Sequence, residues 1–539
     1  FIIIMGGGNL NLASYRGSGN DIISVNPQIT FFKKVFKRHT NFGIETKEIS
    51  VSGSKTVDFG NRHTFVINKS GTLITDIHLE FTLPPAANEG GTDGTTLINC
   101  LDPTDSSTDL GSSSGAVKKW KNYVYWINNI GHSIVDTVEL FIQNNLIDKQ
   151  TGLWYDIWNE LTDPNKKEWP LIGKRDDDYG GYFPPISNKK SRYYVPLKFF
   201  FNKNPGLALP IFLLNDNDVK IDIKLAELSK LLKFQTDGSN TEIHTASIEN
   251  FKMFATYIYL DIEEQNRIKT HLPSEYLIET VTINENVTDI SSITNVNNPV
   301  KEIIWVFRNE NRLKAVSLPS SAVPEYNDNG TNAVATDEFT NDPFNYSYHA
   351  ENGQLDYGTK DPITYVSIKI SNIEIQAKTD ATYFRTMQPY KYHSNIPGGI
   401  NDNEKKKYIY MYSFALNPEE YQPSGAFNFS KKDDYLSFEL TDAAGNSGIP
   451  SGYRMDVFIV CYKYIRFTLG SATLYDVPYI STEFTNEAIV KGAEMELKKK
   501  YIESKEHSVQ NNNNQNRNQN PQKNIPKKKW GGFQDEYNK

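Results

Sequence analysis

Polar and apolar residues alternate over long stretches of this chain. Between residues 75 and 83, apolar side chains occupy every second position from Ile77 to Leu83, and Pro84 ends the run. A period of two places these side chains on one face of a half-buried β-strand. His78 lies between two of them, so we expect it on the solvent-facing side of the strand and not in a metal site.

Similar runs recur through both halves of the chain and predict further strands. They span about residues 121–127, 134–142, 193–201, 209–214, 219–225, 251–262, 276–283, 301–308, 363–376, 408–416, 435–440 and 453–468. Short strands separated by turns at this spacing predict an all-β chain. We expect two tandem eight-stranded antiparallel jelly-rolls, accompanied by short helices and a C-terminal extension.

The same pattern suggests where the parts of the chain begin and end. We place an N-terminal arm at residues 1–29, the first jelly-roll at 30–265, a polar linker at 266–274, the second jelly-roll at 275–470 and a C-terminal extension at 471–539. A weak internal similarity supports duplication. Val138-Glu139-Leu140 precedes Gly152-Leu153-Trp154-Tyr155, and Ile373-Glu374-Ile375 precedes Ala381-Thr382-Tyr383-Phe384.

Two segments have helical spacing. Apolar residues between 153 and 161 fall on one helical face, and Phe32 and Phe36 lie four apart within residues 26–42. Cations crowd the other side of this second segment, at Lys33, Lys34, Lys37 and Arg38. We expect a lead-in helix that either caps a β core or presents a basic surface to a membrane or polyanion on the inner side of an assembly.

Two long loops and the end of the chain are polar. Residues 84–116 and 322–360 contain few large apolar side chains, so we expect them on the outer, solvent-facing surface. Residues 484–505 have helical spacing, and residues 510–520 are almost all Asn and Gln, a disordered composition. Residues 491–539 contain 11 Lys and Arg against 6 Asp and Glu. We expect an interaction arm here, with Lys527, Lys528, Lys529 and Trp530 as contacts to a partner.

Composition narrows the class of protein. Of 539 residues, 38% are hydrophobic and 23% charged, which suits a folded core better than disorder. The net charge of -8 argues against sequence-specific nucleic-acid binding over the surface. Two cysteines, Cys100 and Cys461, cannot form a disulfide framework and indicate a reducing compartment. No run of 18 apolar residues predicts a membrane-spanning helix.

The sequence lacks the common patterns of phosphate and zinc binding. It has no GxxxxGK[ST] loop, which binds phosphate, and neither the HExxH nor the CxxC spacing, which bind zinc. Acidic pairs such as Glu263-Glu264 lie in polar segments, where solvated carboxylates are expected. We therefore expect no catalytic residue, no cofactor and no metal, and a protein that is not an enzyme.

Four stretches, in the same order along the chain, resemble one family. They are NPQITFFKKVFKRHTNF (26–42), NKNPGLALP (202–210), QPYKYHSNIPGG (388–399) and NPEEYQPSGAFNFS (417–430). They are similar to signatures of the double jelly-roll major capsid proteins of the nucleocytoplasmic large DNA viruses, which include giant and algal viruses. The resemblance covers about residues 20–470.

The resemblance implies a structural function. Three copies would form a homotrimeric, pseudo-hexagonal capsomer, and capsomers would tile an icosahedral shell in a virion assembled in the host cytoplasm. The implied partners are neighbouring capsomers, minor capsid proteins and an inner viral membrane. Two alternatives remain at this point: a minor capsid paralogue of the same virion, and a glycan-binding β-sandwich protein.

The motif residues also have a local interpretation as loop scaffold. Pro205 and Gly206 suit a tight turn, and Asn417-Pro418-Glu419 suits the start of a helix. A turn into the next strand is expected from Tyr421, Gln422, Pro423, Ser424 and Gly425. The chain departs from the family pattern in two places: an acidic stretch, Asn215–Asp218, and some 70 residues after the last expected strand.

Overall fold

The computed structural model describes twelve stretches of the chain. They are residues 26–34, 36–53, 57–84, 123–174, 190–215, 218–235, 248–293, 298–313, 343–347, 361–398, 407–429 and 435–476. The expected helix at 484–505, the tail with Lys527, Lys528, Lys529 and Trp530, and the expected loop at 84–116 apart from Pro84 lie outside these residues.

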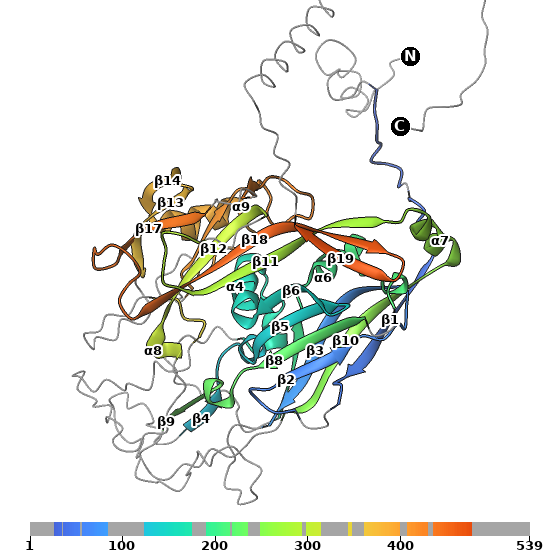
Figure 1. The fold of residues 1–539 in the computed structure, drawn as a ribbon, viewed down its shortest axis with the longest axis horizontal. Coiled ribbons are helices and arrows are strands. Elements are labelled where there is room, and N and C mark those ends of the chain that lie inside the picture. Colours follow the sequence, from blue (N-terminus) through green and yellow to red (C-terminus); the bar gives the residue numbers. More distant parts are fainter. Residues whose placement is uncertain are drawn as a thin grey trace, which may run out of the picture. The chain divides into compact units, whose positions relative to one another are not determined.

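The first jelly-roll consists of two four-stranded antiparallel sheets (Figure 1). One sheet has the order β1 (Phe42–Ser50), β10 (Glu249–Leu260), β3 (Leu73–Leu83) and β7 (Ser191–Pro196). The other has the order β2 (Arg62–Val66), β8 (Val219–Leu225), β5 (Val135–Ile142) and β6 (Asn145–Thr151). A separate ribbon pairs β4 (Tyr123–Trp126) with β9 (Leu232–Gln235). The first and last long strands are neighbours, as a jelly-roll requires.

The second jelly-roll repeats this order. One sheet contains β11 (Ser274–Val287), β18 (Tyr453–Thr468), β12 (Pro299–Asn309) and β15 (Ile409–Ser413), with β16 (Phe427–Asn428) paired to β12 and β19 (Ser471–Asp476) to β18. The other contains β14 (Ile373–Asp380), β13 (Ile363–Ile370) and β17 (Leu436–Asp442). The equivalent of β2 beside β17 is reduced to a single bridge between Ile293 and Leu436. The predicted all-β double jelly-roll is therefore confirmed.

Alternating apolar residues of each pair of sheets fill the cores. Ile77, Leu79 and Phe81 of β3 are fully buried, as their period of two predicts. In the second core, Trp305 of β12 lies 5.2 Å from Phe438 of β17, measured between ring centroids. His78 points away from the core and stacks on Phe254 of β10, which agrees with the expected solvent-facing side of the strand.

The helices are short and lie between strands. The helix predicted at 153–161 is α4 (Gly152–Thr162). The expected linker overlaps α7 (Ile262–Thr270), whose first turn is capped by the side chain of Asp261. The others are α3 (Ile130–Ser133), α5 (Trp169–Ile172), α6 (Phe200–Lys203), α8 (Glu310–Leu313) and α9 (Gln388–Tyr392), which follows the π-helical turn η5 (Tyr383–Met387). None of the described helices is long and apolar enough to cross a membrane.

The lead-in helix predicted at 26–42 is wrong. Residues 26–34 and 36–41 form turns and extended chain, and Phe42 already belongs to β1. Phe31, Phe32 and Phe36 are 88%, 99% and 80% exposed, so no core surface covers the expected aromatic face. A short helix without such packing is marginal in water. Lys33, Lys34, Lys37 and Arg38 lie in the same exposed arm.

Three other local expectations also need correction. The run at 209–214 contains Pro210 and forms one 3-10 turn, Ile211–Leu213, instead of a strand. The run at 363–376 is two strands, β13 and β14, joined at Ser371 and Asn372 with φ of 47° and 67°. Within the loop expected to be exposed at 322–360, residues 344–347 are buried because they pack at the contact described below.

The internal similarity pairs equivalent helices but not equivalent strands. Residues 138–140 lie in β5, whereas 373–375 lie in β14, which occupies the position of β6. Residues 152–155 and 381–384 both begin the helix that follows this sixth strand. The equivalence of these two helices is used below.

Candidate functional site at the junction of the two jelly-rolls

Three of the four family-like stretches meet where the two jelly-rolls touch. The hydroxyl of Tyr421 donates a hydrogen bond to the carbonyl oxygen of Phe200 across this junction, at 2.9 Å. Lys203 pairs with Glu279 of β11 at 3.2 Å. His393 lies against Trp158 of α4 with its ring edge-on. Segments that are far apart in the chain thus form one contact area, which we call the junction.

Helix α4 forms part of the first jelly-roll's side of the junction. Thr151 caps its start, because the Thr151 side chain accepts a hydrogen bond from the amide of Trp154. Gly152 allows the close approach of α3, since a Cβ there would lie 2.0 Å from the carbonyl oxygen of His132. Trp154 stacks on Phe458 of β18, with 5.6 Å between ring centroids.

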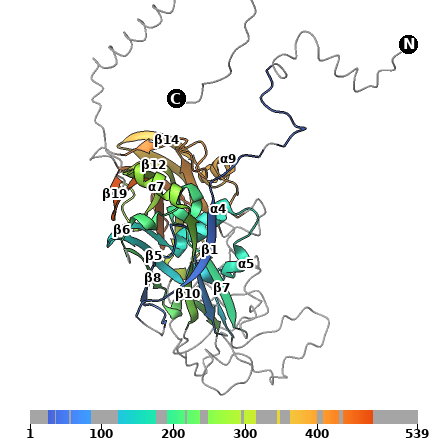
Figure 2. The same ribbon diagram turned by 90° about the vertical axis from the view of Figure 1, so that its right-hand side faces the viewer.

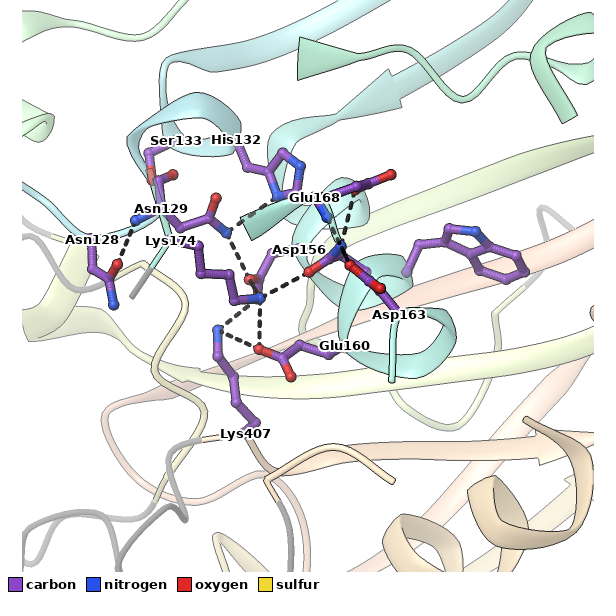
Figure 3. Close-up of polar contacts among 12 residues, drawn as sticks. Asn128, Asn129, His132, Ser133, Asp156, Glu160, Asp163, Glu168, Lys174 and Lys407 are labelled. Atoms are coloured by element: carbon purple, nitrogen blue, oxygen red, sulfur yellow. Dashed lines mark hydrogen bonds and ion pairs between the residues drawn. The ribbon is translucent and has the colours of Figure 1, made fainter. Parts of the chain in front are cut away.

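A buried ionic cluster surrounds Asp156 of α4 (Figure 3). Its Oδ1 contacts Nζ of Lys174 at 3.1 Å, and its Oδ2 contacts Nζ of Lys407 at 2.7 Å. Lys174 also pairs with Glu160, one turn further along α4, at 2.7 Å. The hydroxyl of Tyr346 donates to Asp156 Oδ2 at 2.7 Å. Lys407 and Tyr346 belong to the second jelly-roll, so this cluster joins the two.

The charges of this cluster stabilise one another. Burial alone would raise the pKa of Asp156, but Lys174 and Lys407 outweigh it and hold that pKa below its ordinary value. Burial would likewise lower the pKa of Lys174, and Asp156 and Glu160 raise it instead. Asp156 and Lys174 are therefore both charged at neutral pH. Removing one partner from such a buried set is costly, because it leaves a charge without compensation.

His393 forms a second buried cluster beside the first. Its Nε2 lies 2.8 Å from Oε2 of Glu302, and its Nδ1 lies 3.0 Å from Oε1 of Glu419. The side chain of His393 has no exposed surface. Burial would lower its pKa, but Glu302 and Glu419 together raise that pKa to about 9. The ring is an imidazolium at neutral pH, and both nitrogens donate to carboxylates.

The residues after His393 cap the end of α4. The backbone amide of Asn395 donates to the carbonyl oxygen of Leu161 at 3.0 Å. The side-chain amide of Asn395 donates to the carbonyl oxygen of Glu160 at 2.8 Å. The hydroxyl of Ser394 donates to the carbonyl oxygen of Thr162 at 3.3 Å. The last carbonyl groups of a helix have no partner within it. Here the second jelly-roll supplies the missing donors.

A third group of charges lies between β6 and β11. Lys301 and Lys203 both contact the carboxylate of Glu279. Burial raises the pKa of Glu279, and the two lysines more than reverse this, so its pKa is lowered. Asp148 of β6 is fully buried and accepts a hydrogen bond from Gln150 at 2.7 Å. Burial raises the pKa of Asp148 to about 6, the opposite direction from Glu279.

The motif residues singled out in the sequence have defined positions in loops. Pro205 and Gly206 lie in a 3-10 turn that Asn204 caps by accepting from the amide of Gly206 at 2.7 Å. The helix start expected at Asn417-Pro418-Glu419 is wrong. Pro418 and Glu419 lie in a turn, and the carboxylate of Glu419 contacts His393. Gln422 and Pro423 follow Tyr421 in this loop.

The next two motif residues shape the end of that loop. The hydroxyl of Ser424 accepts from the amide of Asn417 at 2.9 Å. Gly425 has a φ of 142°, and a Cβ there would lie 2.7 Å from the carbonyl oxygen of Phe414. Gly425 is therefore required both by its backbone conformation and by this close approach.

Sequence reasoning missed the charged residues of the junction. Asp156, Lys174 and Lys407 have no recognisable spacing, and Lys174 lies in residues 163–190, which are mostly polar. Lys301 and Glu302 offered a signal, because adjacent charges interrupt the apolar strand β12 and are both buried. In the described part of the chain, no group of His, Cys, Asp or Glu has the geometry of a metal site.

Two tandem sandwiches joined by such a junction define a double jelly-roll protein, an architecture shared with viral capsid proteins of known structure. The structure of VP54 from PBCV-1 matches with a TM-score of 0.57 and 25% identity, covering 83% of this chain and 99% of that one. The Faustovirus major capsid protein matches with a TM-score of 0.55 and 16% identity, covering 82% and 93%, which shows the fold.

Sequence comparisons show the family. Residues 30–261 match the family described as "Major capsid protein N-terminus", and residues 217–473 match "Large eukaryotic DNA virus major capsid protein". The major capsid protein of Paramecium bursaria Chlorella virus 1 is 31% identical over 442 residues, covering 80% of this chain and 86% of the relative. That of Phaeocystis pouchetii virus is 29% identical over 557 residues, covering 87% and 99%.

The chain belongs to the family of major capsid proteins of large eukaryotic DNA viruses. Its role is structural: it is a component of the virion capsid and contacts neighbouring capsid subunits. The family places it among capsid proteins and not among glycan-binding β-sandwiches, so the resemblance found in the sequence is confirmed.

Proposed function

We propose that three copies of this chain form a stable homotrimer with pseudo-hexagonal outline. The observation that carries this proposal is the repeated sheet order, because two equivalent jelly-rolls per chain give six per trimer. A repeated head-to-tail contact between similar units closes into a ring when its rotation allows. Such trimers would tile an icosahedral shell assembled in the host cytoplasm. No metal, nucleotide or disulfide takes part in this proposal.

The test is the mass of the purified full-length protein. Native mass spectrometry and sedimentation at moderate salt should both give three chains per particle. A monomer at micromolar concentration would contradict the proposal. Copy number in purified virions then separates the main shell protein from a minor capsid paralogue, since the shell protein must be the most abundant chain.

We propose that the exposed arm at residues 26–41 contacts an anionic partner on the inner side of the shell. Lys33, Lys34, Lys37 and Arg38 stand beside exposed phenylalanines, and residues 29–41 contain no acidic side chain. Cations next to aromatic residues suit an anionic membrane surface, where each well-placed Lys contributes about 1 kcal/mol. Lys527, Lys528, Lys529 and Trp530 would act in the same way in the C-terminal extension, toward the membrane or a minor capsid protein.

Co-flotation of the full-length protein with vesicles tests the arm. Vesicles containing about one-third phosphatidylserine should carry the wild type, and the variant with Gln at positions 33, 34, 37 and 38 should float less. Vesicles of phosphatidylcholine alone are the control. Equal flotation of both proteins on the anionic vesicles would contradict the membrane contact by this arm.

The long polar loops are proposed to face the outside of the capsomer. Residues 85–116 and the parts of 322–360 outside 344–347 contain few large apolar side chains. Limited proteolysis of intact particles should cut there first. Protection of both loops in intact particles would contradict this orientation.

A further inference from the structure

The helices that follow the sixth strand of each jelly-roll can be compared position by position. Helix α4 begins at Gly152 after β6, and residues 381–392 form the corresponding helical segment after β14. Their inward faces match: Tyr155 and Phe384, at equivalent positions, are both fully buried in their own jelly-roll. Asn159 and Gln388, one turn later, are both buried as well. The two helices therefore sit on their jelly-rolls in the same orientation.

The outward face of α4 is an apolar stripe that the second jelly-roll covers. Trp154, Trp158 and Leu161 lie at helical spacing i, i+4 and i+7. Trp154 stacks on Phe458, Trp158 contacts His393, and the carbonyl of Leu161 accepts from Asn395. No residue of α4 is exposed.

The outward face of residues 381–392 carries an equivalent stripe. Its first member, Tyr383, is half-buried against the apolar core, and the described chain leaves the other two members exposed. Tyr383, Met387 and Tyr390 stand at the positions equivalent to Trp154, Trp158 and Leu161. Met387 is 53% exposed and Tyr390 is 70% exposed. Large exposed apolar side chains in such a row mark an interaction surface.

The sheet surface of the second jelly-roll that covers α4 has an equivalent surface in the first jelly-roll. Phe458 of β18 is paired with Ile304 of β12, and both are buried. In the first jelly-roll, β10 and β3 occupy the places of β18 and β12, and there Phe254 is paired with His78. Phe254 and His78 stack with ring centroids 5.4 Å apart, and Tyr194 of β7 lies 6.2 Å from His78. These three rings are only half-buried and form an aromatic platform on the outer face of the sheet.

We propose that the stripe Tyr383–Met387–Tyr390 of one chain docks on the platform His78–Tyr194–Phe254 of a second copy. This inference rests on the proposed trimer and names the residues of its interchain contact. The junction within one chain joins a helix stripe of one jelly-roll to the outer sheet face of the next. Repeating that contact between chains uses the two surfaces that the single chain leaves open. The Met387 thioether and the platform rings are well suited to each other, because sulfur–aromatic contacts are favourable.

Introducing negative charges into the stripe tests the contact in the full-length protein. Met387→Glu combined with Tyr390→Glu should convert the trimer to the mass of a single chain in sedimentation and native mass spectrometry. Both residues are exposed, so the variant should keep the wild-type circular dichroism spectrum. Met387→Leu and Ile262→Glu, the latter on exposed α7, are controls that should remain trimeric.

Cross-linking tests the pairing itself. Met387→Cys combined with Tyr194→Cys should give disulfide-linked chains under mild oxidation, whereas each single variant and the pair Ile262→Cys with Tyr194→Cys should not. This inference would be overturned if the wild type is a trimer, the double Glu variant is also a trimer, and the cysteine pair does not cross-link. The proposed trimer would then still stand. A monomeric wild type would overturn both.

Discussion

His393 carries a positive charge where its side chain has no contact with solvent. Its pKa of about 9 lies above the ordinary value of 6.5, because Glu302 and Glu419 hold the proton. A group whose pKa is raised by folding stabilises the fold fully below its unfolded pKa, and this contribution is lost as the pH rises through the folded pKa. The folded protein should therefore lose stability between about pH 6.5 and 9 because of this one residue.

The variant His393→Gln should remove most of this pH dependence. At pH 6 the variant should be less stable than the wild type by at most about 3 kcal/mol, and the difference should shrink toward pH 9.5. Chemical denaturation at several pH values measures it. His271→Gln is the control, because His271 is exposed and its ring contacts only a backbone carbonyl in its own helix. An identical pH slope in wild type and His393→Gln would contradict the assignment.

Asp156 shows how much a buried charge differs from an exposed one. Asp156→Asn would leave Lys174 and Lys407 with Glu160 as their one remaining carboxylate partner among the described residues, and we expect a loss of about 3–5 kcal/mol. Glu249→Gln breaks an exposed pair with Lys190 and should cost less than about 1 kcal/mol. Urea denaturation at pH 7 compares the two. Similar losses would show that the cluster is not the buried ionic contact described here.

At the scale of elements, helix α4 is completed by another part of the chain. Its start is capped locally by Thr151, whereas its end is capped by Ser394 and Asn395 of the second jelly-roll. The helix is short, and helices of this length are marginal without packing. The order of α4 should therefore depend on the second jelly-roll.

Asn395→Ala tests this dependence. Loss of the side-chain bond to the Glu160 carbonyl should cost about 1 kcal/mol and speed hydrogen exchange at the end of α4. Asn417→Ala, at an exposed Asn in the neighbouring motif, is the control and should leave exchange in α4 unchanged. Unchanged exchange in Asn395→Ala as well would mean that packing alone holds the end of the helix.

At the scale of the whole molecule, the two jelly-rolls are expected to unfold together. Two groups of buried charges and the α4 cap cross the junction. Each leaves unpaired polar groups if one jelly-roll unfolds alone, which is unfavourable in a buried site. Asp156→Asn should thus speed hydrogen exchange in β12 and β18 as well as in α4. Faster exchange confined to the first jelly-roll would contradict the coupling.

Much of the fold was readable from the sequence because its signals are local. The period of two along β3, the strands β5, β8, β11, β12, β17 and β18, and the helix α4 all followed from side-chain spacing. Family motifs added the double jelly-roll and the capsid role. Local spacing failed where packing decides: residues 26–42 have helical spacing but lack a surface to pack on, and residues 344–347 are buried within a polar loop.

The residues of the junction were decided by tertiary structure. Asp156, Lys174, Tyr346 and Lys407 come from four separate segments, and tertiary packing brings these polar groups together. Sequence spacing describes neighbours along one element, whereas a buried ion pair depends on which elements meet and on how far water is excluded. The chain by itself thus determined strands, motifs and family. The tertiary structure decided which charges are buried, which end of α4 is capped, and which apolar stripe is left open.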